Sequence, residues 1–214
     1  LQPEQRFWLR LGGVLPAAEV YLNGEYVGYT SSSRTQQRVD VTPWIRPGAT
    51  NHVAIRVCDP PEVRLDGLWE MTEAYGFWNG VYRSLAVQVA HRTAVADLYV
   101  CPDIHTGRVR VEVALTKAPE LPADLVLRVR DGRRLVAEER VPAGTAAVNA
   151  WVTLKDFGLW SPAHPKLYGL EVSVVARRGR RVLDRVDLRF GMRAIRTDAQ
   201  RFYLNDQPIY VRCF

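Results

Sequence analysis

The sequence is poor in the residues that most often build metal sites and cross-links. Its 214 residues include 3 cysteines and 4 histidines. Cys58, Cys101 and Cys213 have no CxxC spacing and the histidines form no HxH or HxxxH pair, so we expect reduced thiols, no metal site and no cofactor. No segment approaches the roughly 18 consecutive apolar residues of a membrane-spanning helix. No membrane partner is therefore expected.

Lysine is also scarce, because 26 of the 29 basic residues are arginine. The net charge of +6 arises between Thr93 and Arg196, which hold 18 basic and 12 acidic residues, whereas the flanking segments are balanced. The densest arginine runs, 128–134 and 177–181, lie at predicted hairpin ends without a nucleic-acid-binding motif. We interpret them as solvated arginines and expect no nucleic-acid partner.

Helical periodicity is hard to find, whereas alternation of polar and apolar residues is frequent, which predicts an all-β fold. Between the runs 19–22 and 25–29 stands Asn23-Gly24, a strong signal for a hairpin with a type I′ turn. Further strands are expected at 6–11, 38–41, 52–57 and 82–90.

A second set of alternating runs follows, with turns at Asp131-Gly132 and Arg178-Gly179. About seven short strands with regular turns are typical of an immunoglobulin-like β-sandwich. The runs are 95–100, 109–115, 125–130, 134–141, 147–153, 167–176 and 182–190. Near the end, 201–212 resembles one more hairpin.

Several short motifs occur in the order found in glycoside hydrolase family 2, which the sequence therefore resembles. They are Val20–Gly28 (VYLNGEYVG), Val39–Thr42 (VDVT), Pro47–Val57 (PGATNHVAIRV), Tyr75–Arg83 (YGFWNGVYR), Leu159–Tyr168 (LWSPAHPKLY), Phe190–Arg193 (FGMR) and Phe202–Ile209 (FYLNDQPI). Two positions depart from the family pattern: Asp206 stands where glycine is usual, and Cys213 stands where glycine often follows arginine.

The resemblance implies three parts. Residues 1–91 would form a jelly-roll-like sugar-binding β-sandwich, truncated at its amino terminus, and residues 92–196 an immunoglobulin-like β-sandwich. Residues 197–214 would be the opening hairpin of a catalytic TIM barrel that this chain lacks. The parent enzyme would hydrolyse a terminal β-glycosidic bond with retention, as β-galactosidases and β-glucuronidases do. The expected partners are a β-glycoside carbohydrate and the missing barrel, and assembly into a homo-oligomer is left open.

We expect no catalytic residue in this chain. Retaining glycosidases need two carboxyl groups about 5–5.5 Å apart. The resemblance places both in the barrel, with the acid/base glutamate directly after an asparagine, and the sequence contains no Asn-Glu dipeptide. A barrel of about 250 residues would not fit in this chain.

The segment 63–79 is the best candidate for contact with sugar, because it combines aromatic and acidic residues without a regular period. The candidate residues are Asp66, Trp69, Glu70, Trp78 and Asn79. Indole rings suit the C–H faces of a pyranose, and carboxylates suit its hydroxyl groups. The alternative is a structural loop anchored by its two tryptophans, with solvated acids.

Two other functions remain open. The chain could be a free-standing carbohydrate-binding module, which would bind sugar without any barrel. It could also be a structural pair of β-sandwiches that has no sugar site.

Overall fold

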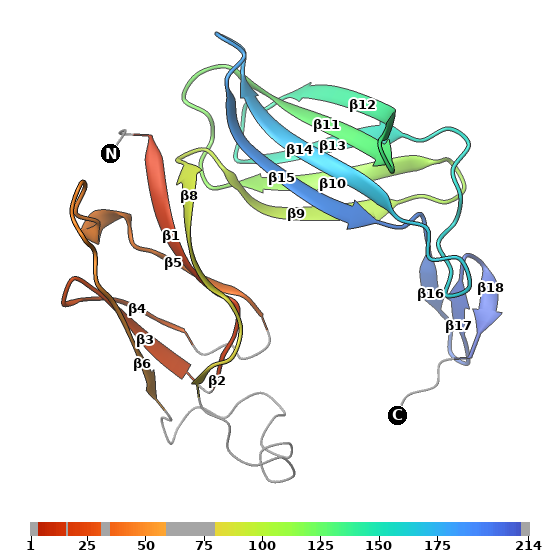
Figure 1. The fold of residues 1–214 in the computed structure, drawn as a ribbon. Coiled ribbons are helices and arrows are strands. Elements are labelled where there is room, and N and C mark those ends of the chain that lie inside the picture. Colours follow the sequence, from red (N-terminus) through yellow and green to blue (C-terminus); the bar gives the residue numbers. More distant parts are fainter. Residues whose placement is uncertain (1–3, 16, 31–34, 59–79, 211–214) are drawn as a thin grey trace. The chain divides into compact units, whose positions relative to one another are not determined.

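The computed structural model describes residues 4–15, 17–30, 35–58 and 80–210, and it divides into two compact units, Leu1–His91 and Arg92–Phe214 (Figure 1). The regular structure is almost entirely β, which confirms the predicted all-β class. Within these ranges no helix is long and apolar enough to cross a membrane.

The first unit contains two three-stranded antiparallel sheets, ordered β5-β1-β8 and β4-β3-β6, and a short β2-β7 pair. A 3₁₀ turn, η1, follows β5. The bounds are β1 (Gln5–Leu11), β2 (Val14–Leu15), β3 (Ala17–Leu22), β4 (Glu25–Thr30), β5 (Gln37–Asp40), η1 (Thr42–Trp44), β6 (Val53–Cys58), β7 (Gly80–Val81) and β8 (Leu85–His91).

The core of the first unit lies between its two main sheets. Leu9 and Leu11 from β1 pack in one cluster with Val20 and Leu22 from β3. The edge strands β4 and β5 are in contact on one side of this sandwich. On β8 the apolar stripe Leu85, Val87 and Val89 is about half exposed, although it pairs with the core-facing residues of β1. One stripe of core-facing residues is thus not covered by the described chain.

The motifs of the first unit have structural roles. The φ values of Asn23 and Gly24 are 55° and 90°, which confirms the predicted hairpin turn. The Asn23 amide also donates to the Trp44 carbonyl at 2.8 Å and to Asn51 Oδ1 at 3.0 Å. Thr42 Oγ1 accepts from the Phe7 amide at 2.8 Å. Asn23, Thr42 and Asn51 therefore hold neighbouring loops together.

The second unit contains two facing antiparallel sheets, ordered β13-β10-β9 and β12-β11-β14-β15, and a separate small sheet, β16-β17-β18. The arrangement of the two facing sheets is an immunoglobulin-like sandwich, as predicted. The bounds are β9 (Val95–Pro102), β10 (Arg108–Leu115), β11 (Ala123–Asp131), β12 (Arg134–Pro142), β13 (Ala147–Thr153), β14 (Tyr168–Ala176), β15 (Val182–Phe190), β16 (Ile195–Thr197), β17 (Phe202–Leu204) and β18 (Gln207–Ile209).

Strict alternation builds the core of this sandwich. Every second residue of β10, β11 and β14 is buried between the sheets, including Val111, Leu127 and Val172, each with an exposed fraction of 0%. The intervening residues point outward. Because the period of a strand is two, the sequence of each strand sets which side chains reach the core and which form the outer face.

Three of the family motifs meet beside the small sheet. Trp160 donates its amide to the Met192 carbonyl at 2.9 Å, and the Arg193 guanidinium lies 4.7 Å from the centre of the Trp160 ring. The Asn205 side-chain amide donates to the Trp160 carbonyl at 2.9 Å, and its Oδ1 accepts from the Ala194 amide at 3.0 Å. These contacts fasten the small sheet to the sandwich.

The small sheet differs from the predicted hairpin by one strand. Besides β17 and β18, it includes β16, which pairs with β17 so that Ile195 faces Leu204. All three strands have three residues, too few to show alternation; β17 and β18 were predicted from the turn residues Asn205-Asp206 between them, and no such turn signal adjoins β16.

Candidate functional site

The five residues predicted to contact sugar are not placed by the structure. Asp66, Trp69, Glu70, Trp78 and Asn79 belong to residues 59–79, which lie outside the described residues. They remain predictions. Among the described residues, the best-formed polar site lies on the outer face of the sheet β12-β11-β14-β15.

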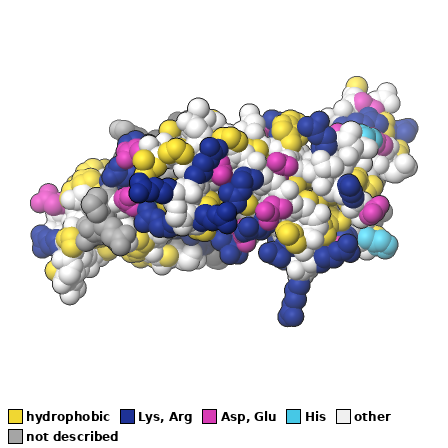
Figure 2. All heavy atoms as spheres, turned by 90° about the horizontal axis from the view of Figure 1, so that it is seen from above, with side chains coloured by type: hydrophobic (Ala, Val, Ile, Leu, Met, Phe, Trp, Pro, Cys, Tyr) yellow, Lys and Arg dark blue, Asp and Glu magenta, His cyan; other side chains and the backbone are white. Residues whose placement is uncertain are grey.

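Arginine and carboxylate side chains alternate across this outer face. The strand register places Glu138, Arg128, Glu171 and Asp187 in one row across the sheet. Figure 2 shows the result from above: arginine and lysine side chains gather over these strands with carboxylates between them. Opposite charges on neighbouring strands stabilise a sheet modestly.

Within this row, arginines bridge the carboxylates. Arg128 donates to Glu138 Oε2 at 2.6 Å and to Glu171 Oε1 at 3.0 Å, and these hydrogen bonds raise the pKa of Arg128 above its ordinary value. Arg185 donates to both carboxylate oxygens of Asp187, at 3.0 and 3.1 Å. It also lies 3.2 Å from Glu171 Oε2. The carboxylates of Glu171 and Asp187 are thereby held in fixed positions.

A second cluster surrounds Asp124 on β11. Asp124 accepts from Arg177 Nε at 2.7 Å and from Arg140 at 3.2 Å. Burial by itself would raise the pKa of this carboxyl, but the hydrogen bonds from Arg177 and Arg140 outweigh burial and hold the pKa below its usual range. The two arginines share this one carboxylate, so the cluster keeps a net charge of about +1.

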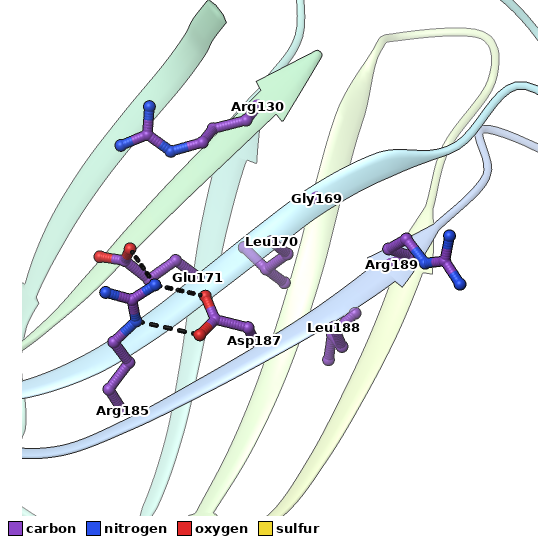
Figure 3. Close-up of a pocket in the computed structure, with 8 residues that line it drawn as sticks. All are labelled: Arg130, Gly169, Leu170, Glu171, Arg185, Asp187, Leu188 and Arg189. Atoms are coloured by element: carbon purple, nitrogen blue, oxygen red, sulfur yellow. Dashed lines mark hydrogen bonds and ion pairs between the residues drawn. The ribbon is translucent and has the colours of Figure 1, made fainter. Parts of the chain in front are cut away.

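A pocket of about 320 Å³ opens on this outer face beside the charged row. Gly169 of β14 lies in the wall of this pocket, and the register places Arg130 and Arg189 on either side of it. Figure 3 shows these two arginines on opposite sides of Gly169, with Glu171, Arg185 and Asp187 farther along the same strands. The pocket therefore has two flanking cations at one end and two carboxylates at the other.

The two flanking arginines differ from the others on this face. Arg130 makes one long hydrogen bond, 3.4 Å to the Arg133 carbonyl. Arg189 has no hydrogen-bond or ion-pair partner among residues 4–15, 17–30, 35–58 and 80–210. The register of β11 with β12 shifts between Val129 and Arg130. Such bulges re-aim side chains and are common beside functional sites.

The sequence did not predict this pocket. The alternation Arg185-Val186-Asp187-Leu188-Arg189 could have shown that three charged residues share one face of β15. The register that brings Arg130, Gly169 and Arg189 together is not visible in the sequence, because these residues come from three separate strands.

Two family models match the chain, one after the other. The model described as the glycosyl hydrolase 2 galactose-binding domain-like family matches residues 1–94, and the model for glycosyl hydrolases family 2 matches residues 93–193. Their junction coincides with the division between the two units.

The chain is also similar in sequence to two proteins named as β-galactosidases. The chain is 27% identical over 214 residues to a β-galactosidase large subunit from Leuconostoc lactis, covering 97% of this chain and 33% of that protein. It is 24% identical to a β-galactosidase from Clostridium acetobutylicum, covering 84% of this chain and 20% of that protein. The chain thus spans one fifth to one third of the length of these relatives.

Solved structures show the same fold. A family 2 member from Bacteroides cellulosilyticus superposes with a TM-score of 0.81 at 21% identity, covering 96% of this chain and 29% of that one. A β-glucuronidase from Bacteroides uniformis superposes with a TM-score of 0.79 at 21% identity, covering 96% and 26%. Because the two family models together match residues 1–193, we conclude that the chain belongs to glycosyl hydrolase family 2 and carries its galactose-binding-like and immunoglobulin-like domains.

Proposed function

We propose that this chain is the non-catalytic amino-terminal part of an enzyme that hydrolyses terminal β-glycosidic bonds with retention. One observation carries the proposal: the two family 2 domains occupy residues 1–193, while the aligned part covers only 33% and 20% of the two relatives named above. The sequence also lacks the Asn-Glu pair expected of the catalytic barrel. In this proposal the two sandwiches brace the barrel and shape the rim of its sugar pocket.

The small sheet supports the assignment of residues 197–214 to the start of the barrel. Ile195, Phe202 and Ile209 lie on one face of β16-β17-β18 by their register. Their exposed fractions are 60%, 50% and 37%. A cluster of exposed apolar side chains on a small sheet is a typical interaction surface. A barrel that begins at this hairpin would cover it.

The exposed stripe on β8 supports the expectation that the first sandwich is incomplete. Leu85, Val87 and Val89 face the same way as the buried side chains of β1. Additional chain of the whole protein would bury this stripe and complete the sugar-binding domain.

The proposal can be tested by comparing the 214-residue chain with the complete gene product. Both would be assayed with 4-nitrophenyl β-galactoside and β-glucuronide, and the anomer released first would be identified by NMR. We expect no turnover by the 214-residue chain, and hydrolysis with retention by the complete protein. Turnover by the shorter chain that survives repurification, and that is lost on replacing one of its carboxylates, would overturn the proposal.

A further inference from the structure

The pocket beside Gly169 has features that neither folding nor the proposed hydrolase role explains. Gly169 does not have a positive φ, and a Cβ placed there would meet no atom within 4 Å. Neither backbone strain nor packing therefore demands glycine at this position. A side chain would project into the pocket, so glycine keeps it open.

The charges around the pocket do not balance. Arg128, Arg140, Arg177 and Arg185 of this region each pair with a carboxylate. No such pair is formed by Arg130 or Arg189 within the described part of the chain. Arg140 and Arg177 share the carboxylate of Asp124, so Arg130 and Arg189 differ from them in having no carboxylate partner at all in this part of the chain.

The positions of these arginines suit a single small anion. Arg130 and Arg189 are both register partners of Gly169, so their backbones lie two strand spacings apart, about 10 Å. Figure 3 shows the two guanidinium groups pointing away from Gly169 in opposite directions, so an anion between them requires both side chains to turn inward. Guanidinium groups bind oxyanions such as carboxylate and sulfate with paired hydrogen bonds. A single negative charge here would offset one of these two positive charges.

The other end of the pocket limits what this anion can be. Glu171 and Asp187 stand two residues farther along their strands, about 7 Å from the level of Gly169. Arg185 holds both carboxylates in place. Glu171 Oε1 already accepts from Arg128 and Ser173, but Glu171 Oε2 and the two Asp187 oxygens can each accept another hydrogen bond. A ligand with negative charge at both ends would be repelled, whereas one with hydroxyl groups at this end would be bound.

We propose that this pocket binds a monoanionic sugar, with its carboxylate or sulfate between Arg130 and Arg189 and its hydroxyl groups donating to Glu171 and Asp187. The distance between the two ends is about that of one pyranose ring with its substituents. A volume of about 320 Å³ lies at the small end of the range for ligand pockets. The inference does not depend on the proposed hydrolase function.

The test uses the ¹⁵N-labelled 214-residue chain and three probes: methyl β-D-glucuronide, methyl β-D-glucoside and inorganic sulfate. We expect the glucuronide to shift the amide resonances of residues 169–171 and 187–189. We also expect it to bind at least about tenfold more tightly than the neutral glucoside, because only the glucuronide brings a negative charge to the arginines. Sulfate should bind more weakly than the glucuronide.

Matched variants separate the site from general charge effects. Arg130→Gln combined with Arg189→Gln should weaken glucuronide binding at least about tenfold. Gly169→Val should abolish it while both arginines stay, and its folding can be checked by its dispersed amide spectrum. Arg178→Gln, which removes an exposed arginine from the turn after β14, should leave binding unchanged.

Three results would overturn the inference. The first is equal binding of glucuronide and glucoside. The second is equal binding of sulfate and glucuronide, which would indicate an anion site without a role for the sugar ring. The third is the absence of any shift at residues 169–171 in the folded chain.

Discussion

Leu9 and Val87 face each other across the β1–β8 pair, yet Leu9 is 2% exposed and Val87 is 55% exposed. Both side chains point to the same side of their sheet. The difference arises from position: β1 is the central strand of its sheet, while β8 is at the edge. The core of the first unit therefore extends to β1 and ends at β8.

This pair predicts unequal effects of truncation. Leu9→Ala should lower the free energy of unfolding of the first unit by about 2–5 kcal/mol, because it removes buried methyl groups from a packed core. Val87→Ala should change it by less than about 0.5 kcal/mol in the 214-residue chain. Urea unfolding followed by far-ultraviolet circular dichroism would measure both. Equal losses would show that β8 is buried in solution.

The glycines of the second unit predict a second contrast. A Cβ at Gly191 would lie 2.7 Å from Trp160 Cβ and 2.9 Å from Trp160 Cγ, so Gly191→Ala should cost about 1–3 kcal/mol through overpacking. Gly169→Ala meets open space and should cost less than about 0.5 kcal/mol. Thermal unfolding of the two variants would compare them directly. A stable Gly191→Ala variant would mean that the Trp160 loop can shift without loss.

The sequence predicted the features that depend on local chemistry. Asn23-Gly24 predicts its own turn because type I′ geometry needs a positive φ at both positions. Strand alternation predicts the core-facing side chains of β10 and β11, but not that Asp124 and Val126 on the other face of β11 are also buried. Features that depend on pairing were not predicted. The pocket exists because Arg130, Gly169 and Arg189 share one register row, and alternation identifies the face of a residue but not its neighbours across the sheet.

Acid should destabilise the second unit through Asp124. Its pKa is lowered in the folded state: burial opposes the shift, and the hydrogen bonds from Arg177 and Arg140 prevail. The unfolded value is about 3.9. A carboxyl with a depressed folded pKa contributes stability that is complete above the unfolded pKa and is lost as pH falls through the folded pKa. Stability should therefore fall below about pH 4.

Asp124→Asn should reduce this acid dependence, and it should cost about 1–3 kcal/mol near neutral pH because charged hydrogen bonds are lost. Urea midpoints between pH 6 and pH 2.5 would measure both effects. Asp97→Asn, which removes an exposed carboxylate from β9, is the matched control and should preserve the slope. An unchanged slope in Asp124→Asn would assign the acid sensitivity to other groups.

Asn205 should control the attachment of the small sheet. Its side chain donates to the Trp160 carbonyl and accepts from the Ala194 amide, and its φ of 51° is a value that asparagine tolerates better than alanine. Asn205→Ala should therefore speed trypsin cleavage at Arg196 and Arg201 several-fold. Asn149→Ala, on the exposed face of β13, should leave cleavage unchanged. Equal cleavage rates would show that other contacts hold the sheet.

The segment between β6 and β7 gives the last prediction, which concerns the complete protein. Long connections in compact domains are often functional, and the two tryptophans and the acidic residues of 63–79 argue for function. If Asp66 and Glu70 meet sugar hydroxyl groups, Asp66→Ala or Glu70→Ala should lower kcat/KM by about 1–3 kcal/mol, the cost of an unpaired buried polar group. That loss corresponds to roughly 5- to 150-fold.

Glu73→Ala is the control within the same segment, because it removes a carboxylate that we do not place at the sugar. Steady-state kinetics with the best aryl β-glycoside would compare the three variants. A loss confined to Asp66→Ala and Glu70→Ala would support the sugar contact. If all three variants keep the parent kcat/KM, and if Trp69 and Trp78 are fully buried within the first sandwich in a structure of the complete protein, the segment is structural and the assignment is wrong.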